Sequence, residues 1–176
     1  MSVRLPERVQ VLIDTLGLSP HPEGGWYRET YRGTSNGEST SAQGHSGEGH
    51  SRDEDARGAS TMIYFLLSSE DRSRFHRIDA DEGWHHYEGD PVRVHILDRG
   101  EHHWLDVGPL QGEIEPQGIV PAGVWFGAEV LAGPHGYALV GCTVAPAFEF
   151  SRFELAERST LLSAAPEHSV IIERLT

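Results

Sequence analysis

The sequence lacks features that several classes of protein require. Its one cysteine, Cys142, excludes an internal disulfide, and the apolar run around it predicts a buried and inert thiol. No stretch approaches the ~20 apolar residues that span a bilayer, and the N-terminal residues contain no apolar core of a secretion signal. We therefore expect a cytoplasmic protein that does not insert into membranes.

Positive charge is also scarce. The 176 residues carry 14 basic side chains against 27 acidic ones, which gives a net charge of −13 at neutral pH. A surface of this sign repels nucleic-acid phosphates and anionic lipid headgroups, so we expect neither nucleic acid nor a membrane as a partner. The length suits one domain over residues 1–176, with a single sizeable core.

Common catalytic signatures are missing as well. The sequence has no glycine-rich phosphate loop, no Gly-x-Ser-x-Gly, no Cys-x-x-Cys and no His-Glu-x-x-His. Nucleotide-dependent, serine-hydrolase, dithiol and zinc-protease chemistry therefore find no support in it.

Two parts of the N-terminal region differ sharply in pattern. Apolar residues at i, i+3, i+4 and i+7 predict a short helix with one buried face, formed by Val9, Leu12, Ile13 and Leu16. Residues 33–57 are rich in glycine, serine and charged residues and have almost nothing to bury. They predict a flexible insertion between two strands.

From residue 60 onward the pattern becomes short β-rich runs separated by turns that contain glycine or proline. The candidate strands are 61–67, 82–87, 92–98, 102–107, 118–121, 124–130, 137–144 and 148–155. Regular spacing of this kind favours an all-β sandwich or barrel. After residue 155 the pattern predicts two short helices separated by Pro166.

Two segments within this β-rich region carry a recognisable layout. His76 is followed by Glu82 six positions on and by Gly89 seven positions after that, and a Pro-x-Gly turn follows at Pro121 and Gly123. This layout resembles the two half-motifs of the cupin superfamily. Residues 21–30 and 139–148 are also similar to the RmlC-like branch of small cupins of the Cupin_5 type, which are largely of unknown function.

The resemblance implies a double-stranded β-helix, the jelly-roll barrel of cupins, built around a pocket. Here it would carry a short N-terminal helix and two short C-terminal helices. It also favours a two-fold homodimer with sheets packed face to face, and C₂ symmetry is the commonest solution for soluble homo-oligomers.

The metal ligands of metal-binding cupins are only partly present. In those proteins the first half-motif supplies two histidines and a glutamate, and the second supplies another histidine. Glu82 fits the glutamate position and His76 falls near the second histidine, but Arg74 and Phe126 occupy the other two positions. Arginine cannot deprotonate to bind a metal. We therefore expect no metal cofactor.

An alternative keeps a divalent transition metal on His76, Glu82 and either His85 or His86. Strand alternation from Glu82 sends Trp84 and His86 toward the interior and His85 outward. The resembling family instead tends to keep the residue at His85. The sequence leaves open which of the two histidines faces the pocket.

The remaining candidates describe a pocket without a metal. His76 and Glu82 would form an acid/base pair whose protonation states are separated by partial burial. Flat walls for a cyclic or sugar-like ligand would come from aromatic residues near the half-motifs: Trp84, Tyr87, Trp125 and Phe126. Beside them, Arg28 could pair with a carboxylate or phosphate of the ligand or form an internal salt bridge, and Arg74, His85 and His86 complete the candidate ligand contacts.

Three functions remain open from the sequence. The first is a metal-independent acid/base enzyme, of the epimerase, isomerase, dehydratase or cyclase type, that acts on a sugar-like or cyclic metabolite. The second is a metal-dependent cupin enzyme that uses His76 and Glu82. The third is a cupin that binds or stores a small molecule without transforming it, because fold does not specify function.

Overall fold

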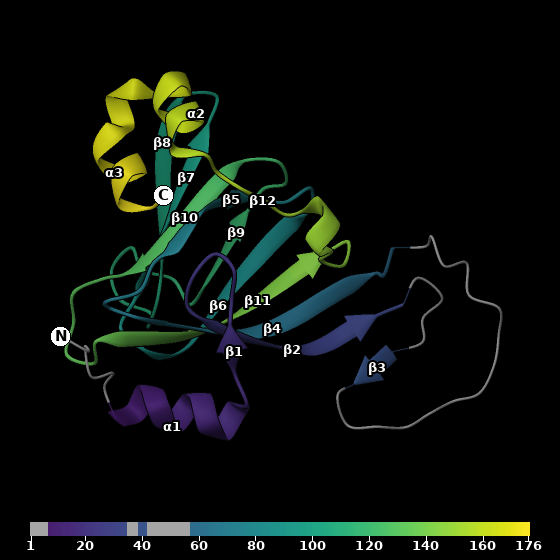
Figure 1. Ribbon diagram of the computed structural model, residues 1–176. Coiled ribbons are helices and arrows are strands. Elements are labelled where there is room, and N and C mark those ends of the chain that lie inside the picture. The colour runs from purple at the N-terminus through teal and green to yellow at the C-terminus, as the bar shows by residue number, and fades with distance from the viewer. Residues whose placement is uncertain (1–6, 35–38, 42–56) are drawn as a thin grey trace.

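The computed structural model describes residues 7–34, 39–41 and 57–176. Two antiparallel sheets face each other and enclose the core (Figure 1). The larger sheet has the order β1 (Ser19–Pro20), β2 (Trp26–Gly33), β4 (Ser60–Ser68), β11 (Tyr137–Ala145), β6 (Asp81–Gly89) and β9 (Gln117–Val120), and β3 (Ser39–Ser41) pairs with β2. The smaller sheet has the order β12 (Glu154–Leu155), β5 (Ser73–Arg77), β10 (Trp125–Val130), β7 (Val92–Asp98) and β8 (Glu101–Val107).

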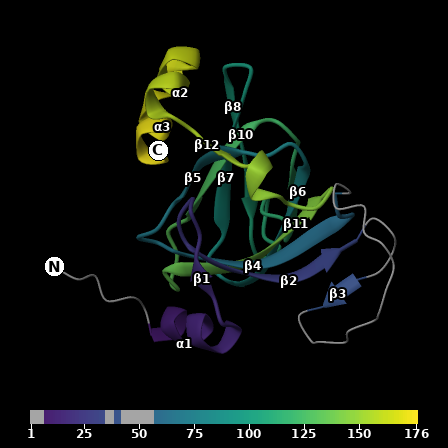
Figure 2. The ribbon, with the colours of Figure 1, turned by 45° about the vertical axis from the view of Figure 1, so that its right-hand side comes forward.

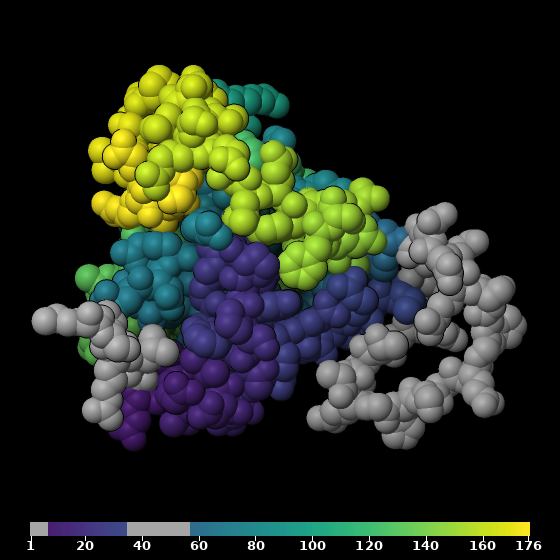
Figure 3. Space-filling model, in the orientation of Figure 1, coloured from purple at the N-terminus to yellow at the C-terminus, as the bar shows by residue number. Residues whose placement is uncertain are grey.

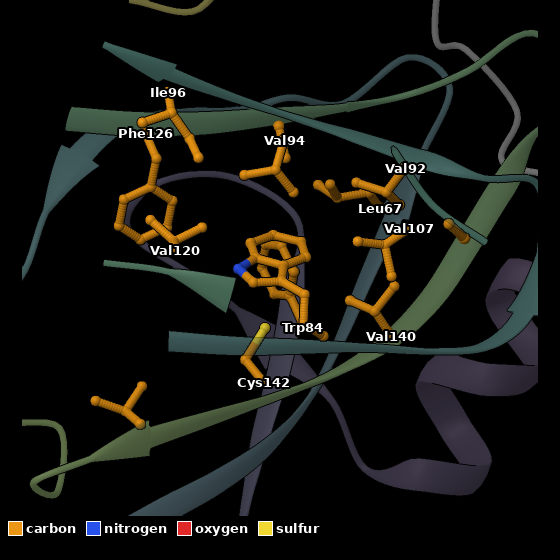
Figure 4. Close-up of a cluster of buried hydrophobic side chains, with 14 of the residues drawn as sticks. Leu67, Trp84, Val92, Val94, Ile96, Val107, Val120, Phe126, Val140 and Cys142 are labelled. Atoms are coloured by element: carbon orange, nitrogen blue, oxygen red, sulfur yellow. The ribbon is translucent and has the colours of Figure 1, made fainter. Parts of the chain in front are cut away.

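The main core fills the space between the two sheets. Trp84 of β6 lies at its centre, 1% exposed, and its ring meets Phe65 of β4 edge to face at 5.9 Å between centroids. Figure 4 shows the indole of Trp84 between valines of several strands, with Cys142 of β11 beside it. Alternate residues of each strand point inward, as the pleat requires, so each strand contributes one apolar row to this core.

In the described part of the chain, three α-helices lie outside the two sheets. Helix α1 (Glu7–Leu16) buries Val9, Leu12 and Ile13 in a second apolar cluster that includes Leu66 and Leu139 of the larger sheet, which confirms the predicted amphipathic helix. The structure also has helices α2 (Arg158–Ala164) and α3 (Ser169–Arg174), joined by the short 3₁₀ helix η2 (Pro166–His168). Figure 2 shows both beside the smaller sheet, away from α1.

The C-terminal helices pack on the strand that carries His76. Leu161, Ile172 and Leu175 form a third apolar cluster with the buried Phe75 of β5. The backbone amide of Phe75 also donates to the carbonyl of Leu175 at 2.7 Å. The C-terminal segment therefore holds β5 in place.

The predicted jelly-roll fold is confirmed, together with its N-terminal helix and two C-terminal helices. Among the strands from residue 60 onward, one was missed. The segment of β5 reads Ser-Arg-Phe-His-Arg and has one large apolar residue, so its pattern is too polar to predict a strand. The predicted strand over 148–155 is interrupted by the 3₁₀ helix η1 (Phe150–Arg152), and only β12 remains of it.

The predicted insertion over residues 33–57 lies largely outside the described residues. Within it the structure describes β3, whose residues pair with β2 from Tyr31 to Gly33. In the described part of the chain, no helix has the length and apolar character needed to cross a membrane.

Candidate functional site

A cavity of about 510 Å³ opens at one end of the interior. Residues from β2, β4, β5, β6 and β11 line it, together with the loop before β2 and residues 148–150. Figure 3 shows the N-terminal segment in purple against the yellow-green segment that contains η1. The rings of His21 and Phe150, one from each segment, lie 6.0 Å apart and are stacked. Two segments far apart in sequence therefore meet at this cavity.

The loop between β1 and β2 places Glu23 in the cavity wall. Gly24 and Gly25 follow it with φ values of +118° and +68°, a region that favours glycine. A Cβ on Gly24 would lie 2.0 Å from the carbonyl oxygen of Arg72, so only glycine allows this close approach. The backbone amide of Arg74 donates to the carbonyl of Glu23 at 2.9 Å and ties the loop to β5.

The Glu23 carboxylate accepts contacts from three buried side chains. Ser73 Oγ donates to Glu23 Oε1 at 2.7 Å, while Oε2 lies 3.2 Å from Nε2 of His76 and 3.3 Å from Nδ1 of His21. Burial by itself raises the pKa of Glu23, but the charge of His76 and the hydrogen bonds of His21 and Ser73 outweigh it and bring the pKa below its ordinary value. Glu23 is therefore a buried anion.

Both ring nitrogens of His76 are engaged. Nδ1 lies 2.7 Å from the carbonyl oxygen of Arg74, which can only accept, so Nδ1 carries a proton. Nε2 then faces the Glu23 carboxylate, and this contact becomes a hydrogen bond when the pair holds one further proton. Burial is the main cause that lowers the pKa of His76, against the opposing effect of Glu23. The two groups thus share one titrating proton.

Glu82 lines the same cavity in the opposite protonation state. Its side chain leaves β6, where it pairs in register with Val144 of β11 and Val120 of β9. Burial, and then the charge of Glu23, raise the pKa of Glu82 to about 8, and a hydrogen bond with Cys142 lowers it only in part. Burial also raises the pKa of the Cys142 thiol well above its ordinary value. Near neutral pH the cavity therefore holds a protonated carboxyl beside a carboxylate.

Comparison with known proteins identifies the family. The family described as Cupin superfamily (DUF985), Cupin_5, matches residues 10–156. The chain belongs to this family. Two solved structures resemble this cupin over nearly its whole length. Protein SO0799 from Shewanella oneidensis is 32% identical, with 95% of this chain and 96% of that chain covered and a TM-score of 0.79. A hypothetical protein from Leishmania major is 30% identical, with 95% and 97% covered and a TM-score of 0.79.

More distant structures share the fold alone. Oxalate decarboxylase from Bacillus subtilis is 14% identical to this cupin, with 89% of this chain and 36% of that chain covered and a TM-score of 0.52. A search of the curated proteins finds no match.

The residues at the cupin metal positions do not fit a metal. Arg74 is exposed and its guanidinium donates to the backbone carbonyls of Pro22 and Glu23. Phe126 packs on His76 with 4.1 Å between ring centroids. Across residues 7–34 and 57–176, no group of three or more His, Cys, Asp or Glu side chains is arranged to hold a metal ion.

His85 and His86 lie outside the cavity wall, so the structure does not bring them together with His76 and Glu82. His85 contacts Thr143 Oγ1 and the Gln117 side chain, each at 3.1 Å. His86 pairs in register with Val140, a core residue, so it shares the inward face that strand alternation predicts. Its Nε2 is buried and has no hydrogen-bond partner among the described residues.

The aromatic residues expected as ligand walls also lie elsewhere. Trp84 and Phe126 are core residues, each 1% exposed. Tyr87 is exposed on the outer face of the larger sheet and meets Tyr64 edge to face. Trp125 packs against the C-terminal cluster, under the guanidinium of Arg77. Each was expected in the wall because it neighbours a half-motif in sequence, but strand direction and burial place it elsewhere.

Of the predicted site residues, His76, Glu82 and Arg28 line the cavity. Sequence reasoning missed His21 and Glu23 in the wall, the hydrogen bond from Ser73 to Glu23, and the aromatic wall formed by Tyr27, Phe65, Phe148 and Phe150. The signal that could have found Glu23 was its position before two glycines, in a segment that packing alone did not explain. No local pattern marked its contact with β5, which is 50 residues away.

Proposed function

We propose that this cupin binds a small cyclic or sugar-like molecule in the cavity and catalyses a proton transfer on it without a metal. One observation carries the proposal. The same cavity wall contains a buried carboxylate held by His76 and a second carboxyl, Glu82, whose pKa is raised to about 8. Two titratable sites whose pKa values are separated in this way provide a proton acceptor and a proton donor at one pH.

The roles follow from these protonation states. The Glu23–His76 pair accepts a proton from the substrate at the position between Nε2 of His76 and the Glu23 carboxylate. Glu82 donates a proton from a different part of the wall. Epimerisation, isomerisation, dehydration and cyclisation need only such a placed acceptor and donor. The apolar side chains of Tyr27, Phe65 and Phe148 exclude water from part of the cavity and provide flat contacts for a ring.

Deuterium exchange tests this proposal before the natural substrate is identified. Candidate cyclic acids, keto acids and sugars are incubated with the protein in deuterated buffer with a chelator, and incorporation is followed by mass spectrometry. We expect exchange into at least one compound. Glu82→Gln and His76→Asn should each lower its rate by about 100-fold or more. Glu113→Gln, at an exposed position, serves as the control.

Three outcomes contradict the proposal. Unchanged exchange in both variants removes His76 and Glu82 from the chemistry. Exchange that occurs in buffer without the chelator and is lost when the chelator is present indicates a metal-dependent enzyme. A compound that stabilises the protein thermally, yet is recovered without deuterium and chemically unchanged, indicates a protein that only binds or stores its ligand.

A further inference from the structure

In the described part of the cavity wall, His21 is the imidazole with a ring nitrogen that the protein leaves open. Both nitrogens of His76 are engaged, by the carbonyl of Arg74 and the carboxylate of Glu23, and 3% of its side chain is exposed. Nδ1 of His21 lies 3.3 Å from Oε2 of Glu23. The other nitrogen, Nε2, makes no hydrogen bond with any residue that the structure describes.

Nε2 of His21 also reaches accessible space. Among residues 7–34, 39–41 and 57–176, the buried side-chain nitrogens and oxygens without a hydrogen-bond partner are Nε1 of Trp84 and Nε2 of His86. Nε2 of His21 lacks a partner and is not one of these atoms, so it is not buried. His21 lines the cavity, and 7% of its side chain is exposed. A ligand in the cavity can therefore contact this nitrogen.

Two contacts at Nδ1 determine which nitrogen of His21 carries the proton. The backbone amide of Glu23 can only donate and lies 3.4 Å away, while the Glu23 carboxylate can only accept and lies 3.3 Å away. Because Glu23 is a buried anion, a charge-assisted hydrogen bond from Nδ1 to the carboxylate is the stronger of the two. Neutral His76 cannot supply this hydrogen bond, since its own proton lies on Nδ1. The proton of neutral His21 is therefore on Nδ1, and Nε2 keeps its lone pair.

Four aromatic rings surround the imidazole of His21. The ring of Tyr27 meets it edge to face at 4.5 Å between centroids, and that of Phe150 is stacked on it at 6.0 Å. Phe65 and Phe153 meet it edge to face at 6.1 and 5.9 Å. These contacts hold the imidazole in one orientation. The face of Phe150 also stabilises positive charge on the imidazole while a proton passes through it.

We infer that His21 is the residue that takes the proton from the ligand, at Nε2, and that it passes a proton from Nδ1 to the Glu23–His76 pair. The inference rests on the proposed function for the reaction and names the group that the ligand touches. A C–H bond of the ligand breaks, its electron pair stays on the ligand, and the proton bonds to Nε2. The Nδ1 proton moves to Oε2 of Glu23 and then lies between this oxygen and Nε2 of His76. His21 is neutral again, and Glu82 gives a proton to the ligand and becomes a carboxylate.

The first test needs no substrate. Diethyl pyrocarbonate transfers an ethoxycarbonyl group to an accessible, unprotonated imidazole nitrogen, and tandem mass spectrometry quantifies the modified peptides. The tryptic peptide over residues 9–28 contains His21 as its single histidine. At pH 7 we expect His21 to react about tenfold or more faster than His76, because its Nε2 is open and carries a lone pair. Glu23→Gln should slow the reaction of His21, since the carboxylate no longer holds the proton on Nδ1. Exposed His103 is the internal control and should react equally in both proteins.

The second test connects His21 to the chemistry. In the deuterium exchange assay, His21→Gln should lower the rate for the responding compound by about 100-fold or more. His21→Ala leaves space in the wall, so added imidazole should restore part of its exchange, which a purely structural role of His21 would not allow. His103→Gln should exchange at the wild-type rate. Circular dichroism and thermal melting confirm that the variants fold.

The inference is overturned if His21 is not modified, if His76 is modified as fast as His21, or if His21→Gln exchanges at the wild-type rate. An unreactive His21 in a protein that still exchanges deuterium would reject the role of His21 and leave the proposed function intact. A selectively reactive His21 in a protein that exchanges no compound would instead reject the proposed proton transfer, so the two failures are distinguished.

Discussion

Oε2 of Glu23 lies 3.2 Å from Nε2 of His76, and this contact joins the N-terminal loop to β5. The opposite nitrogen of the same imidazole lies 2.7 Å from a backbone carbonyl, so its tautomer is set by β5 itself. The relationship fixes where a proton can reside in the cavity: on Nδ1 always, and between Nε2 and the carboxylate when the pair holds one more proton.

The first prediction concerns this tautomer. In two-bond ¹H–¹⁵N spectra at neutral pH, His76 should show a protonated Nδ1, whereas an unconstrained neutral histidine favours protonated Nε2. The physical reason is the backbone acceptor at Nδ1. Exposed His103 provides the comparison in the same spectrum. A neutral His76 protonated only at Nε2 would contradict the assignment.

The second prediction concerns Glu82 and the pH dependence of stability. Burial raises the pKa of Glu82 to about 8 in the folded protein, above its ordinary value in the unfolded chain. Between these values the folded state holds the extra proton, so this group makes the free energy of unfolding fall as pH rises, by about 1.4 kcal/mol per pH unit. In urea titrations from pH 5 to 8, the free energy of unfolding of Glu82→Gln should decline less steeply than that of wild type.

In the same titrations, the free energy of unfolding of Glu113→Gln, a change at an exposed position, should depend on pH as that of wild type does. Parallel curves for Glu82→Gln and wild type would show that Glu82 is already ionised in the folded protein at pH 5.

The third prediction concerns His95, which titrates in the opposite sense. Burial is the main cause that lowers the pKa of His95 to about 4, against the effect of Glu129 at 3.3 Å. Between pH 4 and the ordinary histidine value, the unfolded chain binds the proton and the folded state does not. His95 therefore makes stability rise with pH in this window, by up to about 1.4 kcal/mol per unit.

His95→Gln should flatten that rise in chemical denaturation measured from pH 4 to 6.5, while His103→Gln, at an exposed position, should not. A rise as steep in His95→Gln as in wild type would place the responsible group elsewhere.

The fourth prediction separates backbone strain from crowding at two glycines with positive φ. Gly24→Ala would bring a Cβ to 2.0 Å from a backbone oxygen, whereas Gly112→Ala meets nothing within 4 Å. We expect Gly112→Ala to lower the free energy of unfolding by about 1 kcal/mol and Gly24→Ala by about 3 kcal/mol or more. Equal losses in urea denaturation would mean that the loop before β2 moves to accept the methyl group.

The fifth prediction is a homodimer formed through the outer face of the larger sheet. Met62, Thr143, Gly83 and Ile119 form one row across β4, β11, β6 and β9. Met62 and Ile119 in this row are 39% and 61% exposed, and a second copy would cover them with more than ~1,000 Å² buried in total. Light scattering at low micromolar concentration should give about twice the 19.5 kDa chain mass.

Ile119→Asp should shift the protein toward the monomer, whereas Leu110→Asp, which is 79% exposed in a loop, should not. A wild-type mass of one chain would exclude this dimer.

The sequence by itself determined the class of fold. Strand periodicity with turns, an amphipathic helix at residues 7–16 and two half-motifs were each encoded within short windows, where local sterics and burial of one face act directly. It also supplied His76, Glu82 and Arg28, which the cavity wall contains. Strand alternation gave the correct face for Trp84 and His86.

Tertiary structure decided what these residues contact. Glu23 meets β5 only because the β1–β2 loop folds across the cavity, and Ser73 lies 50 residues from it in sequence. The aromatic residues beside the half-motifs lie away from the cavity because strand register, and not proximity in sequence, sets which side chains reach it. The pKa of Glu82 depends on burial that only the assembled strands create. Such contacts have no local signature, so only the folded chain could reveal the site.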